Sequence, residues 1–170
     1  MMNTMKIFDN FLPNNYFDNL RNTMIGGSFD WHFMPYINSV DEIYDVSKFQ
    51  FIHMFYDYDN GEYPFFPLLI PIIKKLGATE VIKIKANLNP REECPTPFGY
   101  HTDLDVDTDI NVKTSILYLN TNNGYTLFRD GTKVECIENR LVTFDCKLEH
   151  CGVACSDSKC KLIINFNYVI

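Results

Sequence analysis

The sequence predicts a mainly β protein with supporting helices, in which a jelly roll of short strands is covered by helices on one side. From residue 80 onward, short runs rich in β-branched and aromatic residues alternate with turn residues, as in sandwiches and barrels. Helical patterns are confined to the first half of the chain. The 170 residues are 46 % hydrophobic, which is enough for one core and leaves little room for a second domain.

Two helices are expected before residue 78. Residues 9–24 read as a turn followed by a helix, because Pro13 favours the first helical turn and the apolar residues that include Leu20 share one face. Residues 63–76 form a second helical pattern that ends at Gly77, although its prolines weaken the first half. The stretch between the two helices contains glycine and proline breakers and is expected to be irregular up to a strand near its end.

Strands are expected at 49–55, 81–88, 112–120, 125–128, 132–137, 140–144 and 161–169. Within 81–88, alternation predicts one face with Val81, Lys83, Lys85 and Asn87, and an opposite face with Ile82, Ile84, Ala86 and Leu88. Residues 90–99 are rich in proline and glycine and read as a loop. Asp130-Gly131 is a strong hairpin signal between two of the strands.

Charge and hydropathy exclude several partners. The formal net charge of -7 is a poor match for nucleic acid, whose phosphates are bound through Lys and Arg. The start, MMNTMKIFDNFLP, has no apolar core of a signal peptide. The longest apolar run, residues 65–73, is far below the ~20 residues of a membrane helix. We therefore expect a soluble cytoplasmic protein with no membrane partner.

Two groups of side chains suggest metal ions. Four cysteines crowd the C-terminal part: Cys146, Cys151, Cys155 and Cys160. Their C-x4-C-x3-C-x4-C spacing lacks the C-x2-C pair of many structural zinc sites, so reduced thiols are expected and zinc is the alternative. Alternating acidic residues resemble part of a calcium loop: Asp105, Asp107 and Asp109. The glycine and terminal glutamate of that loop are missing, so a solvated acidic loop is expected.

The sharper candidate is the segment Tyr100-His101-Thr102-Asp103. In an extended chain His101 and Asp103 point to the same side, so both can reach one ion. His150, just after a predicted strand, supplies a third ligand. Two imidazoles and one carboxylate form the facial arrangement that leaves positions open on Fe(II). An H-x-D segment alone is weak, and an ordinary hydrogen-bonded histidine is the alternative.

A longer pattern strengthens this interpretation. Its elements are His101-Thr102-Asp103, the segment 113–120, Gly124, Leu127-Phe128, His150 and the segment 161–168. In order and spacing they resemble the 2-oxoglutarate/Fe(II)-dependent dioxygenase superfamily, and within it the prolyl-4-hydroxylase-like branch. The resemblance covers roughly residues 80–168. It implies a double-stranded β-helix over 79–170, with 1–78 supplying helical support and substrate-side segments of the same single domain, 1–170.

The resemblance also implies roles for individual residues. His101, Asp103 and His150 match the iron ligands. Lys161 matches the basic residue that pairs with the far carboxylate of 2-oxoglutarate, and Lys159 is its rival. The hydroxyl of Tyr118 is expected to reach the same carboxylate. Further polar lining is expected from Thr114, which shares the strand face of Tyr118, and from Asn87 and Asn167.

The implied activity is that of an oxidoreductase that uses Fe(II), 2-oxoglutarate and O2, with ascorbate as a candidate reductant. Such an enzyme hydroxylates a C–H bond of a small-molecule or peptide substrate, and a peptidyl proline is the first candidate. Because the fold hosts many chemistries, the alternative is a non-catalytic jelly-roll binding module with incidental histidines.

Overall fold

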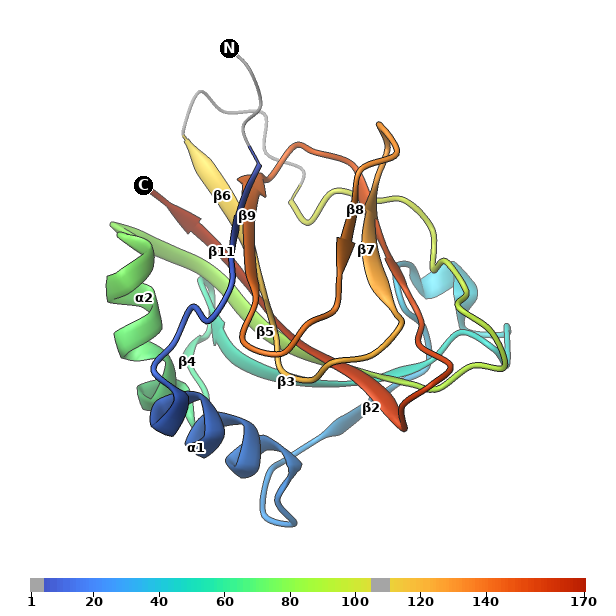
Figure 1. Ribbon diagram of the computed structural model, residues 1–170, viewed down its shortest axis with the longest axis horizontal. Coiled ribbons are helices and arrows are strands. Elements are labelled where there is room, and N and C mark those ends of the chain that lie inside the picture. The colour runs from blue at the N-terminus through green and yellow to red at the C-terminus, as the bar shows by residue number, and fades with distance from the viewer. Residues whose placement is uncertain (1–4, 105–110) are drawn as a thin grey trace.

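The computed structural model describes residues 5–104 and 111–170, which form two antiparallel sheets and helices packed outside the larger one (Figure 1). The strands are β1 Lys6–Phe8, β2 His32–Met34, β3 Gln50–Asp57, β4 Gly61–Glu62, β5 Glu80–Pro90, β6 Val112–Tyr118, β7 Tyr125–Phe128, β8 Lys133–Glu135, β9 Leu141–Asp145, β10 His150–Val153 and β11 Cys160–Val169. The larger sheet has the order β1-β9-β6-β11-β5-β3-β2, with β4 paired to β3. The smaller has the order β10-β7-β8. The predicted mainly β jelly roll with supporting helices is confirmed.

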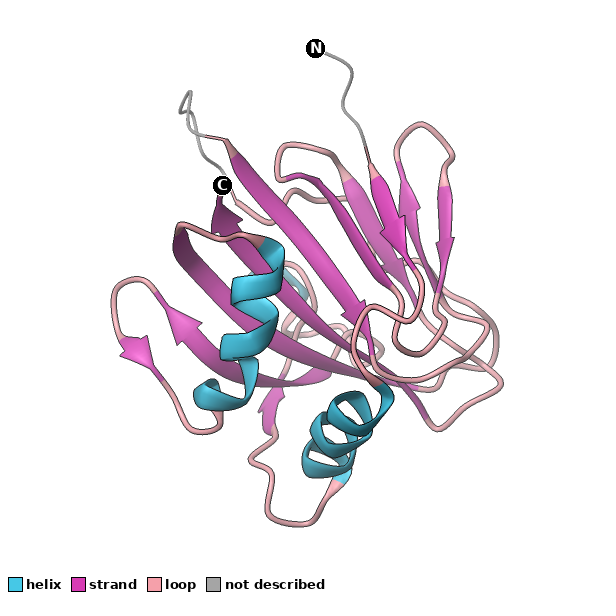
Figure 2. Cartoon of the chain, turned by 60° about the vertical axis from the view of Figure 1, so that its left-hand side comes forward, coloured by secondary structure: helices cyan, strands magenta, loops and turns pink. Residues whose placement is uncertain are grey.

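Both α-helices lie on the face of the larger sheet that points away from the smaller one (Figure 2). They are α1 Asn14–Ile25 and α2 Ile70–Leu76, the latter preceded by the 3-10 helix η2 Phe66–Leu69; a further 3-10 helix, η1 Val40–Glu42, follows β2. The second predicted helix is therefore α-helical only in its last part, because prolines interrupt its first half. It ends at Gly77, whose left-handed φ of 70° suits glycine. No helix within the described residues is long and apolar enough to cross a membrane.

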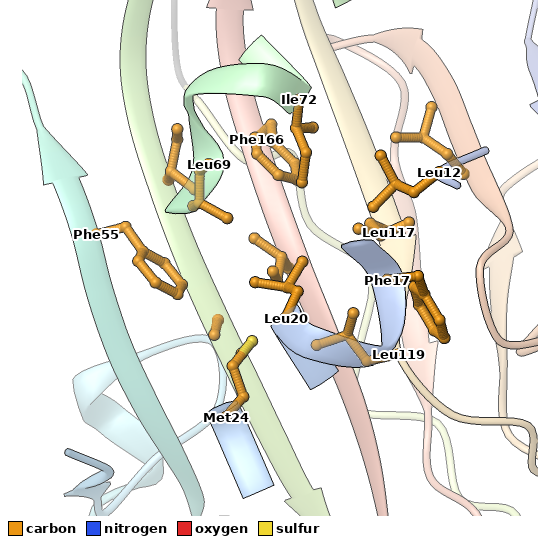
Figure 3. Close-up of a cluster of buried hydrophobic side chains, with 14 of the residues drawn as sticks. Leu12, Phe17, Leu20, Met24, Phe55, Leu69, Ile72, Leu117, Leu119 and Phe166 are labelled. Carbon is orange, nitrogen blue, oxygen red and sulfur yellow. The ribbon is translucent and has the colours of Figure 1, made fainter. Parts of the chain in front are cut away.

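The main core lies between these helices and the larger sheet (Figure 3). Leu20 and Met24 of α1 are almost fully buried and pack with Ile72 of α2 against the sheet. The sheet contributes Leu117 of β6 and Phe166 of β11 to the same cluster. Each such side chain stabilises the packing of the helices on the larger sheet by roughly 1.5–3 kcal/mol through burial.

A second, smaller core lies between the two sheets. Ile116 and Tyr118 alternate with Leu117 along β6, so they turn to this inner side. Phe128 of β7 meets Phe144 of β9 edge-on, with ring centroids 4.9 Å apart. Since the inner cluster fills only part of the space between the sheets, the remaining inner positions are polar and form a pocket.

The register of β5 corrects one prediction from alternation. In the pairing of β11 with β5, Asn167 lies opposite Lys83 but Tyr168 lies opposite Val81, so Ile82 is skipped. This irregularity moves Val81 onto the outer core and away from the predicted face of Lys83. Beyond it the alternation holds, and Lys85 and Asn87 face the inner pocket.

The remaining elements agree with the sequence to different degrees. The hairpin at Asp130-Gly131 is present, with Gly131 at a φ of 89° and the Phe128 N–H donating to the Thr132 carbonyl over 2.9 Å. The short strands β1, β2 and β10 were not predicted, because three or four residues show too little alternation. The acidic loop proposed around Asp107 lies outside the described residues.

Candidate metal centre and its pocket

His101 and His150 are held together by the backbone. The two residues form an isolated antiparallel bridge, in which each N–H donates to the other residue's carbonyl over 2.9 and 3.0 Å. Directly opposite residues of an antiparallel pair place their side chains on the same face. The two imidazole rings accordingly lie with centroids 4.8 Å apart, at the start of β10.

Asp103 completes the group from two residues beyond His101. Its Oδ1 lies 3.7 Å from Nε2 of His101 and 3.8 Å from Nε2 of His150. One ligand atom from each of the three residues lies within 4.8 Å of the others, close enough to hold one ion. Burial acts to raise the pKa of Asp103, but the two neighbouring imidazoles and the hydrogen bond from the Asn165 amide hold that pKa well below its usual range. The carboxyl group is therefore an anion at neutral pH.

The hydrogen bonds of the two histidines engage Nδ1 of each ring and leave each Nε2 available to bind a metal ion. Nδ1 of His150 lies 3.0 Å from the Leu148 carbonyl, and Nδ1 of His101 lies 3.3 Å from the Gly99 carbonyl. A carbonyl can only accept, so each Nδ1 carries the proton and each Nε2 keeps its lone pair. Metal-binding histidines commonly have this second contact, which fixes ring orientation. Burial also lowers the pKa of His150, which favours the neutral ligand form.

Two asparagines of β11 hold the other oxygen of the carboxylate. Nδ2 of Asn165 donates to Asp103 Oδ2 over 3.0 Å, and Nδ2 of Asn167 donates to the same atom over 3.3 Å. Nδ2 of Asn167 also donates to Thr114 Oγ1 over 3.0 Å. Thr114 and Asn167 were predicted as cosubstrate lining. The structure instead places them behind the carboxylate, because β11 and β6 pair with these two residues opposite each other.

A polar pocket opens beside this group and reaches Lys161. Lys161 is 1 % exposed, and its Nζ donates to the carbonyls of Tyr125 over 2.6 Å and Val153 over 3.3 Å. Burial lowers the pKa of its ammonium group to about 8. Within the described ranges no carboxylate lies within ion-pair distance of Lys161. A buried ammonium group without an anionic partner is costly, so the pocket is suited to an anionic ligand.

Tyr118 does not line the pocket. It is fully buried in the inner core, and its hydroxyl donates to Oγ1 of Thr126 over 2.7 Å. Of these two residues, Thr126 on β7 is the one that lines the pocket. The Tyr118 hydroxyl, predicted to reach the cosubstrate, is therefore directed to Thr126 and not into the pocket. Burial raises the pKa of this phenol above its ordinary value.

The remaining predicted residues lie either in the pocket or clearly outside it. Asn87 lines the pocket, where its Nδ2 donates to Gln50 Oε1 over 2.7 Å. Lys159, the rival of Lys161, is exposed and precedes β11, with its backbone carbonyl accepting from the Arg91 N–H over 3.1 Å. The structure thus separates the two lysines by placing Lys161 inside the pocket and Lys159 outside it.

The late cysteines do not form a comparable group. Cys146, Cys151 and Cys155 are buried and Cys160 is half-buried, all as free thiols. In the part of the chain that the structure describes, His101, Asp103 and His150 are the one cluster of His, Cys, Asp or Glu arranged to hold an ion. Burial raises the pKa of the cysteine thiols, which favours the protonated form over a zinc-binding thiolate.

Several pocket residues were not foreseen. Asn165 could have been found, because it lies four positions after Lys161 and therefore on the same face of one strand. Lys85 and Asn89 share the face of the predicted Asn87, which is also a usable signal. Gln50 carries no such signal, since its place depends on the pairing of β3 with β5.

The solved structures place this arrangement among known folds, although no protein-family model and no curated protein sequence matches the chain. A viral collagen prolyl hydroxylase from Paramecium bursaria Chlorella virus-1, in complex with 2-oxoglutarate, is 16 % identical, with 97 % of this chain and 94 % of that chain covered and a TM-score of 0.63. The α-ketoglutarate-dependent epimerase SnoN from nogalamycin biosynthesis is 12 % identical, with 98 % and 78 % covered and a TM-score of 0.66.

A prolyl hydroxylase from Trichoplax adhaerens, in complex with a peptide fragment of a hypoxia-inducible factor, is 15 % identical, with 99 % and 84 % covered and a TM-score of 0.62. These similarities extend over nearly the whole chain and include the helical first half. The chain therefore has the jelly-roll fold of the 2-oxoglutarate/Fe(II)-dependent oxygenases, prolyl hydroxylases among them.

Proposed function

We propose that this protein is a non-haem Fe(II) and 2-oxoglutarate-dependent oxygenase, in which His101, Asp103 and His150 bind the iron and Lys161 binds the far carboxylate of the cosubstrate. The observation that carries the proposal is the convergence of two neutral imidazoles and one carboxylate at one end of a pocket that also contains a buried ammonium group, which has no carboxylate partner among residues 5–104 and 111–170. Iron chemistry requires the first feature, and a dicarboxylate cosubstrate requires the second.

The spacing of the two features supports 2-oxoglutarate. Lys161 Nζ would lie 3.8 Å from a Cβ placed on Gly152, so its ammonium is next to that residue. Gly152 follows His150 by two positions along β10, a separation of ~7 Å at the rise of a strand. A five-carbon dicarboxylate spans a gap of this order, with one end at the metal and the other at Lys161. Glycine at 152 keeps this space open, since a side chain there would also approach the ring of Phe98 to 3.3 Å.

The chain's own residues have distinct tasks in the proposed reaction. Asn165 and Asn167 hold one carboxylate oxygen of Asp103, so the other oxygen points between the histidines. Thr126 and Lys161 mark the end of the pocket that receives the cosubstrate carboxylate. Bound iron with 2-oxoglutarate and O2 would supply an oxidant able to break an unreactive C–H bond. Hydroxylation of that bond is the proposed outcome.

The primary substrate is proposed only as a class. Prolyl hydroxylases are among the similar structures, so a peptidyl proline is the first substrate to test. The epimerase among them shows that small molecules must be tested beside peptides. The test is incubation with Fe(II), 2-oxoglutarate, ascorbate and proline-containing peptides or metabolite pools, followed by mass spectrometry. We expect succinate release and a product heavier by one oxygen atom.

The same incubation separates this proposal from the non-catalytic alternative. A jelly-roll binding module would release no succinate above a metal-free control and would bind 2-oxoglutarate no more tightly with metal than without it. The His101→Ala variant is the matched protein control, because it should lose both signals while keeping Lys161 in place.

A further inference from the structure

The pocket contains a second lysine that the proposed cosubstrate does not use. Lys85 of β5 lines the pocket together with His101 and Asp103. Within the described residues its ammonium group makes no hydrogen bond and has no carboxylate within ion-pair distance. Burial and the charge of Lys83 lower its pKa, and the negative charge of Asp103 acts against them. Lys85 is thus a positive group directed into the pocket with its donors unused.

Strand pairing places Lys85 at the metal end of the pocket. It lies directly opposite Asn165, the residue whose amide binds Asp103. Lys161 lies on the neighbouring strand toward the other end, where it contacts the carbonyls of Tyr125 and Val153 in the smaller sheet. The two ammonium groups therefore reach the metal site from different sides, and Lys85 approaches from the side of β5 and β3.

The polar side chains beside Lys85 already make hydrogen bonds within the protein. Asn87 donates to Gln50 Oε1 over 2.7 Å, and Gln50 donates to the Ile37 carbonyl over 3.0 Å. Asn38 donates to the Phe98 carbonyl over 2.7 Å. All of these side chains line the same pocket. They form a wall with fixed orientation, in which Lys85 is the cationic donor left for a ligand.

A balance of the charges in the proposed complex shows whether Lys85 would have a negative partner. A divalent iron and the ammonium of Lys161 supply three positive charges, and Asp103 with doubly ionised 2-oxoglutarate supplies three negative charges. The charge of Lys85 then stays unmatched in a pocket where burial already disfavours it. Leaving one ammonium group unpaired there is unfavourable, so the next ligand to enter should bring one negative charge.

We propose that Lys85 binds a carboxylate group of the primary substrate and thereby directs that substrate to the metal. The inference rests on the proposed oxygenase function and narrows its substrate to molecules that carry an acidic group. A single unmatched charge fits a carboxylate better than a doubly charged phosphate. The iron-proximal carboxylate of 2-oxoglutarate is the competing partner, and the experiment separates the two.

The test uses the full chain loaded with Mn(II) and 2-oxoglutarate, so that binding is measured without turnover. The probes are N-acetyl amino acids and their matching primary amides, which differ in the negative charge, titrated by calorimetry. We expect at least one acid to bind roughly tenfold or more tightly than its amide. Lys85→Gln should remove that preference, whereas the control Lys83→Gln, on the same strand but outside the pocket, should keep it.

Each other outcome contradicts the inference in a recognisable way. Saturable binding by none of the acids, or an acid preference that survives Lys85→Gln, overturns the substrate role of Lys85. A loss of 2-oxoglutarate affinity in Lys85→Gln, measured in the same titrations, assigns Lys85 to the cosubstrate instead. Failure of 2-oxoglutarate to bind the wild-type Mn(II) protein overturns the proposed function itself and is read before any acid is added.

Discussion

Replacing Lys161 by Met should abolish tight binding of 2-oxoglutarate in a protein that still folds. Methionine keeps a long unbranched side chain, so the change removes the charge without opening a large cavity. In the proposed complex the ammonium group faces a carboxylate in a buried site. Removing one partner of a buried ion pair costs roughly 3–5 kcal/mol, which corresponds to a dissociation constant at least ~100-fold higher.

The stability of the free protein follows from the environment of the same side chain. Burial lowers the pKa of Lys161 from 10.5 to about 8, which corresponds to a cost of roughly 3 kcal/mol for keeping the charge there. The Met variant escapes that cost, but the carbonyls of Tyr125 and Val153 lose a donor, at roughly 1–3 kcal/mol for each carbonyl left unpaired. These effects oppose one another, so the free energy of unfolding should change by no more than ~2–3 kcal/mol.

The assay is calorimetric titration of 2-oxoglutarate into Mn(II)-loaded protein, with chemical denaturation of the free protein alongside it. Lys159→Met is the matched control, because Lys159 is exposed and should change neither quantity. If Lys159→Met weakened 2-oxoglutarate binding more than Lys161→Met, the residue that binds the far carboxylate would be Lys159, outside the pocket. Unchanged 2-oxoglutarate affinity in a folded Lys161→Met protein would refute the reasoning, since the buried ammonium would then have no ligand role.

Three further predictions follow from the site. The affinity for 2-oxoglutarate should fall as pH rises above about 8, the pKa of Lys161 in the free protein, and Lys161→Arg should flatten that profile in calorimetry. Asn165→Ala should weaken Mn(II) binding about 10- to 100-fold, because Asp103 loses a donor that orients it. Changing Cys151 and Cys155 together to Ser should leave iron content unchanged by elemental analysis, with a stability loss of roughly 1–3 kcal/mol.

The stability of the free protein against pH is a further test of the burial of Lys161, and the metal-binding and cysteine predictions each have an outcome that would contradict them. The unfolded chain keeps the proton of Lys161 up to about pH 10.5, so the contribution of Lys161 to the stability of the free protein should rise between about pH 8 and 10.5. A contribution that falls there would contradict the assigned burial. Wild-type metal affinity in Asn165→Ala would remove its positioning role. Stoichiometric zinc that is lost with Cys151 and Cys155 would restore the zinc alternative.

Much of the fold was predictable because long strands carry their pattern locally. The alternation within 112–120 and 161–169 gives both the strand and its inner face, and Gly77 gives the end of a helix. Short strands such as β10 have no pattern of their own and form because a partner strand is beside them. The displaced register at Ile82 likewise depends on tertiary pairing, which a single sequence does not contain.

In the candidate site, too, some residues were predictable from the local sequence and others depend on tertiary structure. His101 and Asp103 were predictable as neighbours in one extended segment, and His150 joined them through the longer resemblance. Face alternation also selects Thr114 and Tyr118, but it does not tell which positions along a strand reach the pocket. Thr114 lies beyond it, behind Asp103, and the Tyr118 hydroxyl is taken by a threonine of the smaller sheet.

The central claim is that His101, Asp103 and His150 hold iron that supports 2-oxoglutarate turnover. Its most direct test is anaerobic titration of Fe(II) into the wild-type protein and into each of the three alanine variants, followed by oxygen exposure and measurement of succinate. We expect one iron per wild-type chain with succinate release, and loss of both in every variant. Near-native iron binding and succinate release in any one of the three variants would contradict it.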